Sequence, residues 1–167
     1  MIRVTLAING ETRSASVPPE TTLLRLLREH FILTGAKLGC DVGDCGACTV
    51  IMDGQAVNAC LVLAGQADGR EVLTIEGLAT RDRLHPLQHA FEKHAALQCG
   101  FCGPGVILAA KALLDENPQP TVPEIRDALA GNLCRCTGYT KMIDAVNEAA
   151  RAMRSEQPAR HLHRKPN

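Results

Sequence analysis

The chain has 167 residues, enough for one domain or two small ones. Its 18 Lys and Arg balance its 18 Asp and Glu, and this zero net charge argues against a general nucleic-acid binder, which needs a basic surplus. Three Phe, one Tyr and no Trp also argue against a surface on which bases stack.

The first half of the chain predicts short strands around one helix. Residues 2–8 alternate apolar with polar or small side chains, the period of a half-buried strand, and Asn9-Gly10 is a strong hairpin-turn signal. A leucine-rich segment, 23–31, predicts the helix, which Thr21 or Thr22 can cap. Further strands are expected at 11–17, 49–52, 55–58 and 71–75.

The second half predicts four helices. The first is expected at 86–94, and the second begins near Pro104, because proline suits the first turn of a helix. Thr121 and Glu124 form a capping-box pair for the third helix, for which Gly131 is the predicted stop. The apolar spacing over 142–153 predicts the fourth.

Cysteine is unusually frequent, with 8 in the chain. The longest apolar stretches, 59–64 and 106–110, are far shorter than the roughly 20 residues that span a bilayer, so no membrane insertion is expected. The N-terminal residues lack the apolar core of a signal peptide, and we expect a cytoplasmic protein. In that reducing compartment, the cysteine count favours metal binding or redox chemistry over disulfides.

The first four cysteines follow the spacing C-x4-C-x2-C-x11-C. They are Cys40, Cys45, Cys48 and Cys60. The first three match the spacing of plant-type [2Fe–2S] ferredoxins. Glycines between them permit positive φ angles, so that backbone N–H groups can point at a negatively charged cluster. Zinc is the alternative, but zinc sites usually use C-x2-C pairs and fit the first gap less well.

The second four cysteines form a C-x2-C pair and a distant C-x-C pair. They are Cys99, Cys102, Cys134 and Cys136. Both pairs precede predicted helices, whose N-termini offer free N–H groups and partial positive charge to an anionic cluster. This spacing alone leaves a zinc site open, and Cys99–Cys102 alone could be a thioredoxin-like redox pair, although that motif belongs in a βα context.

Three segments resemble the iron–sulfur subunit of the xanthine oxidase family of molybdenum hydroxylases. They are Gly-Cys-Asp-Val-Gly-Asp-Cys-Gly-Ala-Cys-Thr at 39–49, Gln-Cys-Gly-Phe-Cys-Gly-Pro-Gly at 98–105 and Gly-Asn-Leu-Cys-Arg-Cys-Thr-Gly-Tyr at 131–139. The resemblance covers residues 2–153. It has one departure at Gly103, where the family usually has Thr; this is not a ligand position, and we expect it only to loosen the start of the following helix.

The resemblance implies an α+β chain of two domains. An N-terminal β-grasp, ferredoxin-like [2Fe–2S] domain is expected over residues 1–76. A C-terminal four-helix [2Fe–2S]-binding domain is expected over 77–155, followed by a disordered tail over 156–167. The eight cysteines above are the implied metal ligands.

The resemblance also implies partners. The helical-domain cluster would lie next to molybdopterin, with its molybdenum, on a large subunit, and the ferredoxin-like cluster would face FAD on a medium subunit, in a dimer of heterotrimers. Carried over, Cys136 would sit against the pterin amino group and Gln98 would contact the pterin. Without the resemblance, Gln98 is interpreted as a solvated polar residue.

Other candidate sites are weaker. His85 and His89 are spaced for metal chelation on a helix, but no third ligand is obvious, and a solvated helix surface is the better interpretation. Arg135 either offsets cluster charge or faces solvent. The sequence lacks the glycine fingerprints of dinucleotide and phosphate binding, so we expect the chain itself to bind no flavin or nicotinamide.

These observations predict an electron-transfer subunit of a molybdenum hydroxylase of the xanthine dehydrogenase, aldehyde oxidase or carbon monoxide dehydrogenase type. No side chain here is expected to act as acid, base or nucleophile, and the substrate would bind on another chain. The Pro104-Gly105 pair resembles the flavin-coupled branch of the family more than the branch that has Ser-Gly there and passes electrons to cytochrome. The alternatives are a free-standing two-cluster ferredoxin and a zinc-binding interaction module.

Overall fold

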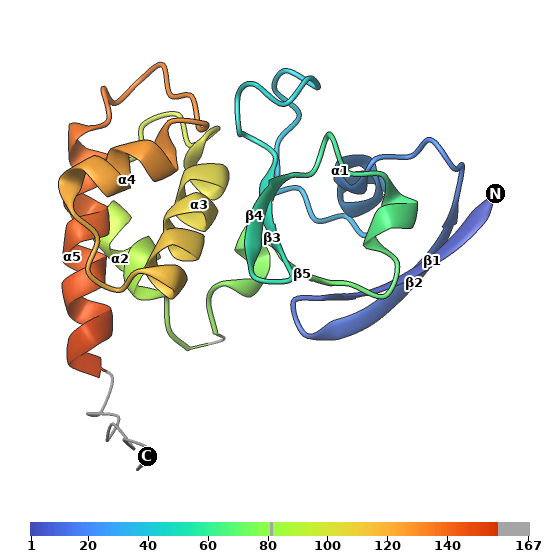
Figure 1. Cartoon of the computed structure of the whole chain (residues 1–167), viewed down its shortest axis with the longest axis horizontal. Helices are drawn as coiled ribbons and strands as arrows, with labels where there is room; N and C mark the ends of the chain where they lie inside the picture. Colours follow the sequence, from blue (N-terminus) through green and yellow to red (C-terminus); the bar gives the residue numbers. More distant parts are fainter. Residues whose placement is uncertain (81, 157–167) are drawn as a thin grey trace, which may run out of the picture.

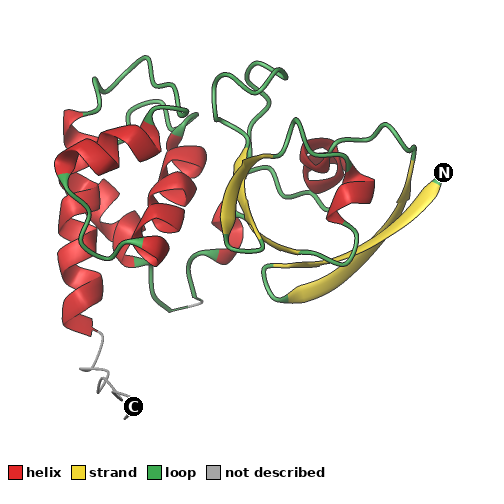
Figure 2. Cartoon of the chain, viewed as in Figure 1, coloured by secondary structure: helices red, strands yellow, loops and turns green. Residues whose placement is uncertain are grey.

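The computed structural model describes residues 1–80 and 82–156, which form two halves lying side by side (Figure 1). A five-stranded sheet with short helical segments makes the first half, and four α-helices make the second (Figure 2). The chain is therefore α+β, with the expected order of a β-grasp domain and a four-helix domain. Helix α5 continues through Glu156, and residues 157–167 of the predicted tail lie outside the described residues.

The sheet is mixed, with the strand order β2-β1-β5-β3-β4. Its strands are β1 (Ile2–Ile8), β2 (Glu11–Val17), β3 (Thr49–Met52), β4 (Gln55–Asn58) and β5 (Glu71–Leu73). Strand β1 pairs in parallel with β5, and the other neighbours are antiparallel. The predicted hairpin turn at Asn9-Gly10 is confirmed, because both residues have positive φ. Asp53 and Gly54 also have positive φ and form the turn between β3 and β4.

One side of this sheet is covered by the leucine-rich segment. It is not the single regular helix that the sequence predicts. A one-turn helix, α1 (Leu23–Arg25), is capped by Thr22 and passes directly into a π-helical segment, η1 (Leu26–His30). Four leucines of the two segments are nevertheless buried in the core that also contains residues of the sheet: Leu23, Leu24, Leu26 and Leu27.

Three further features complete the first half. A short 3-10 helix, η2 (Ala64–Ala67), precedes β5. Strand β5 ends two residues before the predicted position because a second 3-10 helix, η3 (Ile75–Gly77), begins there. The side chain of Glu76 in η3 accepts a hydrogen bond of 2.7 Å from the N–H of Gly35, which fixes the segment leading into the first cysteine loop.

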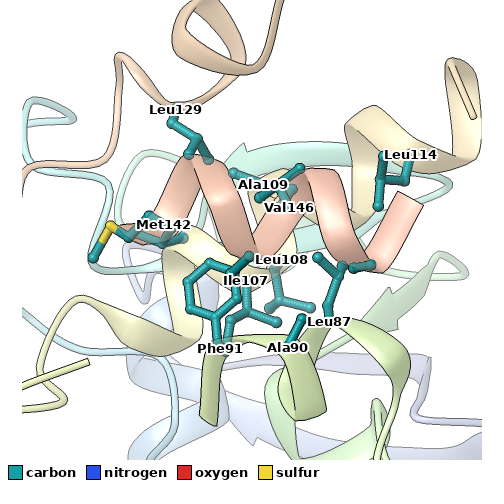
Figure 3. Close-up of a cluster of buried hydrophobic side chains, with 14 of the residues drawn as sticks. Leu87, Ala90, Phe91, Ile107, Leu108, Ala109, Leu114, Leu129, Met142 and Val146 are labelled. Carbon is teal, nitrogen blue, oxygen red and sulfur yellow. The ribbon is translucent and has the colours of Figure 1, made fainter. Parts of the chain in front are cut away.

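The helical half contains α2 (Pro86–Lys93), α3 (Gly103–Glu116), α4 (Val122–Leu129) and α5 (Thr140–Glu156). The predicted capping box of α4 is present, and the helix ends before Gly131, with Ala130 rather than the glycine as its cap. Leu87, Phe91 and Met142 lie in the core between these helices (Figure 3). Ile51 of β3 joins the same core, so that α3 packs against the sheet. Within the described residues, no helix has the length and apolar character needed to cross a bilayer.

Candidate metal centres

The first cysteine loop wraps its backbone around the sulfur of Cys40. The N–H groups of Val42, Asp44 and Cys45 donate hydrogen bonds to this sulfur at 3.5, 3.3 and 3.4 Å. Positive φ angles at Asp41, Gly43 and Gly46 produce the necessary curvature. Consecutive N–H groups converging on one point form a nest that stabilises negative charge, as a thiolate bound to a cluster requires.

The four thiols of this loop differ in environment. The N–H groups of the nest, that of Val42 above all, lower the pKa of Cys40 to about 7. Burial raises the pKa of Cys48 to about 12. Cys60, which follows β4, is buried beside it. Without metal, the buried thiol is therefore protonated, so metal binding must displace its proton.

The second set of cysteines lies on two loops at the ends of helices. Cys99 and Cys102 precede α3, and the other two lie between α4 and α5. The sulfur atoms of Cys99 and Cys136 are 3.6 Å apart, and both residues are exposed. Cys134 accepts a hydrogen bond of 3.4 Å from the N–H of Cys136, and its sulfur lies 3.3 Å from the hydroxyl of Thr137. The structure therefore brings the distant pairs together.

The electrostatics of the second set repeat those of the first. Burial acts to raise the pKa of Cys134, but hydrogen bonds from Thr137 and Cys136 outweigh it and lower this pKa to about 7. Burial raises the pKa of Cys102 to about 12. A hydrogen bond with Cys99 raises the pKa of Cys136. Each set thus combines a thiol whose pKa is lowered with one whose pKa burial raises.

Within each set, the thiols are arranged as two interacting pairs. In the first set, the side chain of Cys45 shifts the pKa of Cys40 and that of Cys60 shifts the pKa of Cys48. In the second set, the side chain of Cys134 shifts the pKa of Cys102, and the sulfur atoms of Cys99 and Cys136 are in contact at 3.6 Å. A [2Fe–2S] cluster takes two protein ligands on each of its two irons, so two pairs fit it. In residues 1–80 and 82–156, no group of three or more His, Cys, Asp or Glu is placed to hold a single ion.

The other residues that the sequence analysis singled out lie near the second set of cysteines or on the surface of the helical half. The side-chain amide of Gln98 donates a hydrogen bond of 3.0 Å to the carbonyl oxygen of Cys136, at the exposed edge of the second set. His85 is not simply a solvated surface residue: it caps α2, where its Nδ1 accepts the N–H of Leu87 at 3.2 Å. His89 and Arg135 are exposed. Gly103 is the first residue of α3, where a Cβ would lie 3.0 Å from the side chain of Leu97.

Two residues that sequence reasoning did not single out support the second loop. The hydroxyl of Tyr139 accepts the N–H of Cys134 at 2.7 Å and donates to the carbonyl oxygen of Asn132 at 3.2 Å. The side chain of Asn132 is buried and reaches back to the first half of the chain. Both residues lie in the third motif, but their residue types alone do not indicate long-range contacts.

The fold, with its two sets of four cysteines, is that of a protein with two candidate iron–sulfur sites. The family comparison agrees: residues 6–74 match the 2Fe-2S iron-sulfur cluster binding domain, and residues 74–147 match the [2Fe-2S] binding domain. The chain is 53% identical to the nicotinate dehydrogenase small FeS subunit of Eubacterium barkeri, over 89% of this chain and 94% of that protein. It is 50% identical to the nicotine 6-hydroxylase small subunit of Paenarthrobacter nicotinovorans, over 89% of both.

The fold of this chain is also similar to those of solved structures. The quinoline 2-oxidoreductase of Pseudomonas putida 86 matches with a TM-score of 0.89 and 45% identity, over 94% of this chain and 98% of that one. The chain spans only 18% of the aldehyde oxidoreductase of Desulfovibrio gigas, which it matches with a TM-score of 0.89. The chain therefore belongs to the family of iron–sulfur subunits of the molybdenum hydroxylases. These relatives are parts of larger enzymes, which disfavours the free-standing ferredoxin.

Proposed function

We propose that this electron-transfer subunit holds its first cluster with Cys40, Cys45, Cys48 and Cys60, and its second with Cys99, Cys102, Cys134 and Cys136. The convergence of three backbone N–H groups on the sulfur of Cys40, and the 3.6 Å contact between the sulfur atoms of Cys99 and Cys136, carry this proposal. A [2Fe–2S] cluster, when bound, accepts and releases one electron at a time. The chain contributes thiolates, hydrogen bonds to sulfur and burial, which set the potential of each cluster.

The second site is proposed to receive electrons from molybdopterin on a large partner subunit. Its edge is open to a partner, because Gln98, Cys99 and Cys136 are exposed next to one another. The hydrogen bond from Gln98 to the carbonyl oxygen of Cys136 holds this edge in place and leaves the amide oxygen of Gln98 available to a pterin. Cys136 is the thiolate nearest to the approaching group in this arrangement.

The first site is proposed to pass electrons to FAD on a medium partner subunit. Apolar side chains surround its loop and remain open to contact: Val42 is 63% exposed and Leu61 is 59% exposed. Leu61 lies against Gly43, where a Cβ would come within 2.5 Å of its side chain, so this apolar rim is part of the loop itself. Exposed apolar residues gathered at one point favour a protein interface. We place the complex in the cytoplasm as a dimer of heterotrimers.

Substrate selection is proposed to belong to the large partner subunit. Relatives of this chain between 44% and 53% identical are named for nicotinate, nicotine and aldehydes. Similar chains thus serve enzymes for different substrates. This agrees with an iron–sulfur subunit that has no substrate site of its own.

Substituting one proposed ligand in each cysteine set tests the proposed order of electron transfer. In the purified complex, Cys60→Ser should leave substrate able to reduce the second cluster in a single turnover, while flavin reduction fails. Cys99→Ser should instead block transfer out of the molybdenum centre. Anaerobic rapid-mixing spectroscopy with excess substrate separates the two cases, with iron content measured for each variant. Normal flavin reduction by a Cys60→Ser complex that lacks its first cluster would overturn the order.

A further inference from the structure

Three glycine-rich segments meet where the two halves of the chain touch. A Cβ at Gly46 would lie 2.2 Å from the carbonyl oxygen of Gly131, and a Cβ at Gly105 would lie 2.3 Å from the carbonyl oxygen of Gly46. Side chains at these two positions would therefore push the backbones apart. We call the contact formed by Gly46, Thr49, Gly105, Gly131 and Asn132 the seam.

Asn132 occupies the centre of the seam and is 5% exposed. Its side-chain amide donates to the carbonyl oxygen of Gly46 at 2.9 Å and to the hydroxyl of Thr49 at 3.1 Å. The Thr49 hydroxyl donates in turn to the carbonyl oxygen of Gly46 at 2.7 Å. A buried amide is costly unless its hydrogen bonds are made, so this geometry strongly favours one arrangement of the two halves.

The seam joins the two cysteine sets directly. The N–H of Leu133, next to Asn132, donates a hydrogen bond of 2.9 Å to the carbonyl oxygen of Cys45. Leu133 is bonded to Cys134, so one hydrogen bond and otherwise covalent bonds connect a ligand of the first set to a ligand of the second. Electron tunnelling falls steeply across empty space, and the one step of this connection that is not covalent is the 2.9 Å hydrogen bond.

We propose that Asn132 is a positioning residue that fixes the separation and orientation of the two clusters. It acts through Gly46 and Thr49, which flank ligands Cys45 and Cys48, and it holds the Leu133–Cys45 hydrogen bond in place. Each transfer moves one electron from the second cluster to the first. The second cluster is oxidised, the first is reduced, and no proton is transferred. The inference rests on the proposed function, because it requires the two cysteine sets to be ligands.

Asn58 provides a matched control. It lies two residues before Cys60, as Asn132 lies two residues before Cys134. Its side-chain amide also donates to a loop carbonyl, that of Gly43, at 2.9 Å. This hydrogen bond stays within the first half of the chain and does not cross the seam. Asn58 lines the same small cavity as Gly131 and Asn132, so Asn58→Ala removes a hydrogen bond beside a ligand, at the same place in the fold, that does not join the two halves.

The test compares Asn132→Ala, Asn58→Ala and the unmodified chain in the intact complex. Iron and sulfide content are measured first, then the magnetic interaction between the two reduced clusters by electron paramagnetic resonance, and then the rate of transfer between them. We expect Asn132→Ala to keep both clusters, alter the magnetic splitting and slow the transfer at least roughly tenfold, as ångström-scale misplacement does elsewhere. Asn58→Ala should change neither the splitting nor the rate.

A loaded Asn132→Ala complex with normal splitting and rate overturns the proposal, and so does an equal loss in Asn58→Ala. If the Asn132→Ala complex does not retain both clusters, Thr49→Val is used in its place. This variant removes the hydroxyl partner of the Asn132 amide. An unchanged magnetic splitting in the Thr49→Val complex then overturns the proposal. These results are distinct from a failure of the proposed function, which would appear as missing clusters in the unmodified chain.

Discussion

The sulfur atoms of Cys99 and Cys136 lie 3.6 Å apart, although the two residues are 37 positions apart in the sequence. The first precedes α3 and the second precedes α5, so the pair joins two helices of the second half. Both residues are exposed. Because a disulfide needs a sulfur separation of about 2.05 Å, a small movement suffices to form one when no iron is bound.

We therefore predict that the iron-free chain forms a Cys99–Cys136 disulfide in air. The two thiols lose two electrons and two protons to oxygen, and the product resists reloading with iron and sulfide until it is reduced. Peptide mass mapping identifies the bond, and Cys99→Ser serves as the control that cannot form it. Persistent free thiols at both positions, or a bond that joins Cys102 instead, would contradict the arrangement of the second site.

Iron removal should also lower the stability of the helical half. Its four proposed ligands come from two loops, and burial raises the pKa of Cys102 to about 12, so metal and folding are coupled. We expect Cys102→Ser to cost about 2 kcal/mol or more, which lowers the melting temperature by roughly 10 °C for a domain of this size. Arg135→Ala, an exposed change in the other loop, is the control. Equal melting temperatures for Cys102→Ser and the unmodified chain would count against the coupling.

Tyr139 supports the second site through its hydroxyl. Tyr139→Phe leaves the N–H of Cys134 without its partner at 2.7 Å and the carbonyl oxygen of Asn132 without its donor at 3.2 Å. A partly buried N–H without a partner costs about 1–3 kcal/mol, and we expect a loss of stability in this range. Denaturant unfolding of the iron-loaded chain measures it. A midpoint unchanged by the substitution would show that the hydroxyl has no stabilising role.

The sequence predicts local structure well where a few neighbouring residues decide it. Asn9-Gly10 sets a hairpin because both residues tolerate positive φ, and Thr121 with Glu124 begins α4 because both capping hydrogen bonds are local. The cysteine spacings predicted two metal sites for the same reason. The structure then added the pairing of thiols, which requires distant loops to meet.

Long-range features were not predictable in this way. The role of Asn132 depends on Gly46, 86 positions earlier, and nothing in the neighbourhood of either residue indicates that contact. The segment η1 is π-helical although the spacing of its leucines predicts a regular helix, and Leu26 and Leu27 are buried in the core of the first half nonetheless. His85 caps a helix although its spacing from His89 suggested only a surface pair, because its Nδ1 is positioned by the following proline turn.

Acid should weaken the contact between α2 and α5. Glu148 accepts hydrogen bonds of 2.7 Å from both Lys93 and His94, and these hydrogen bonds lower its pKa. A carboxylate whose pKa is lowered on folding stabilises the chain above its ordinary pKa of about 4.3, and this stabilisation is lost as pH falls through the lowered value.

The variant Glu148→Gln tests this pH dependence. It should melt below the unmodified chain near neutral pH, and the difference should shrink as the pH falls below about 4. Acid affects the clusters of both chains equally, so the difference between their melting temperatures does not include that effect. Glu92→Gln, an exposed change on α2, is the control. A difference that stays constant with pH would assign the effect to packing rather than charge.

The iron and acid-labile sulfide content of the purified complex tests the central claim most directly. Two [2Fe–2S] domains, each with two irons and two sulfides, predict four of each per chain. Cys60→Ser and Cys99→Ser should each lower both counts to two and remove one of two distinct electron paramagnetic resonance signals. Two irons per unmodified chain, or zinc in place of iron at either set of cysteines, would contradict an electron-transfer subunit with two clusters.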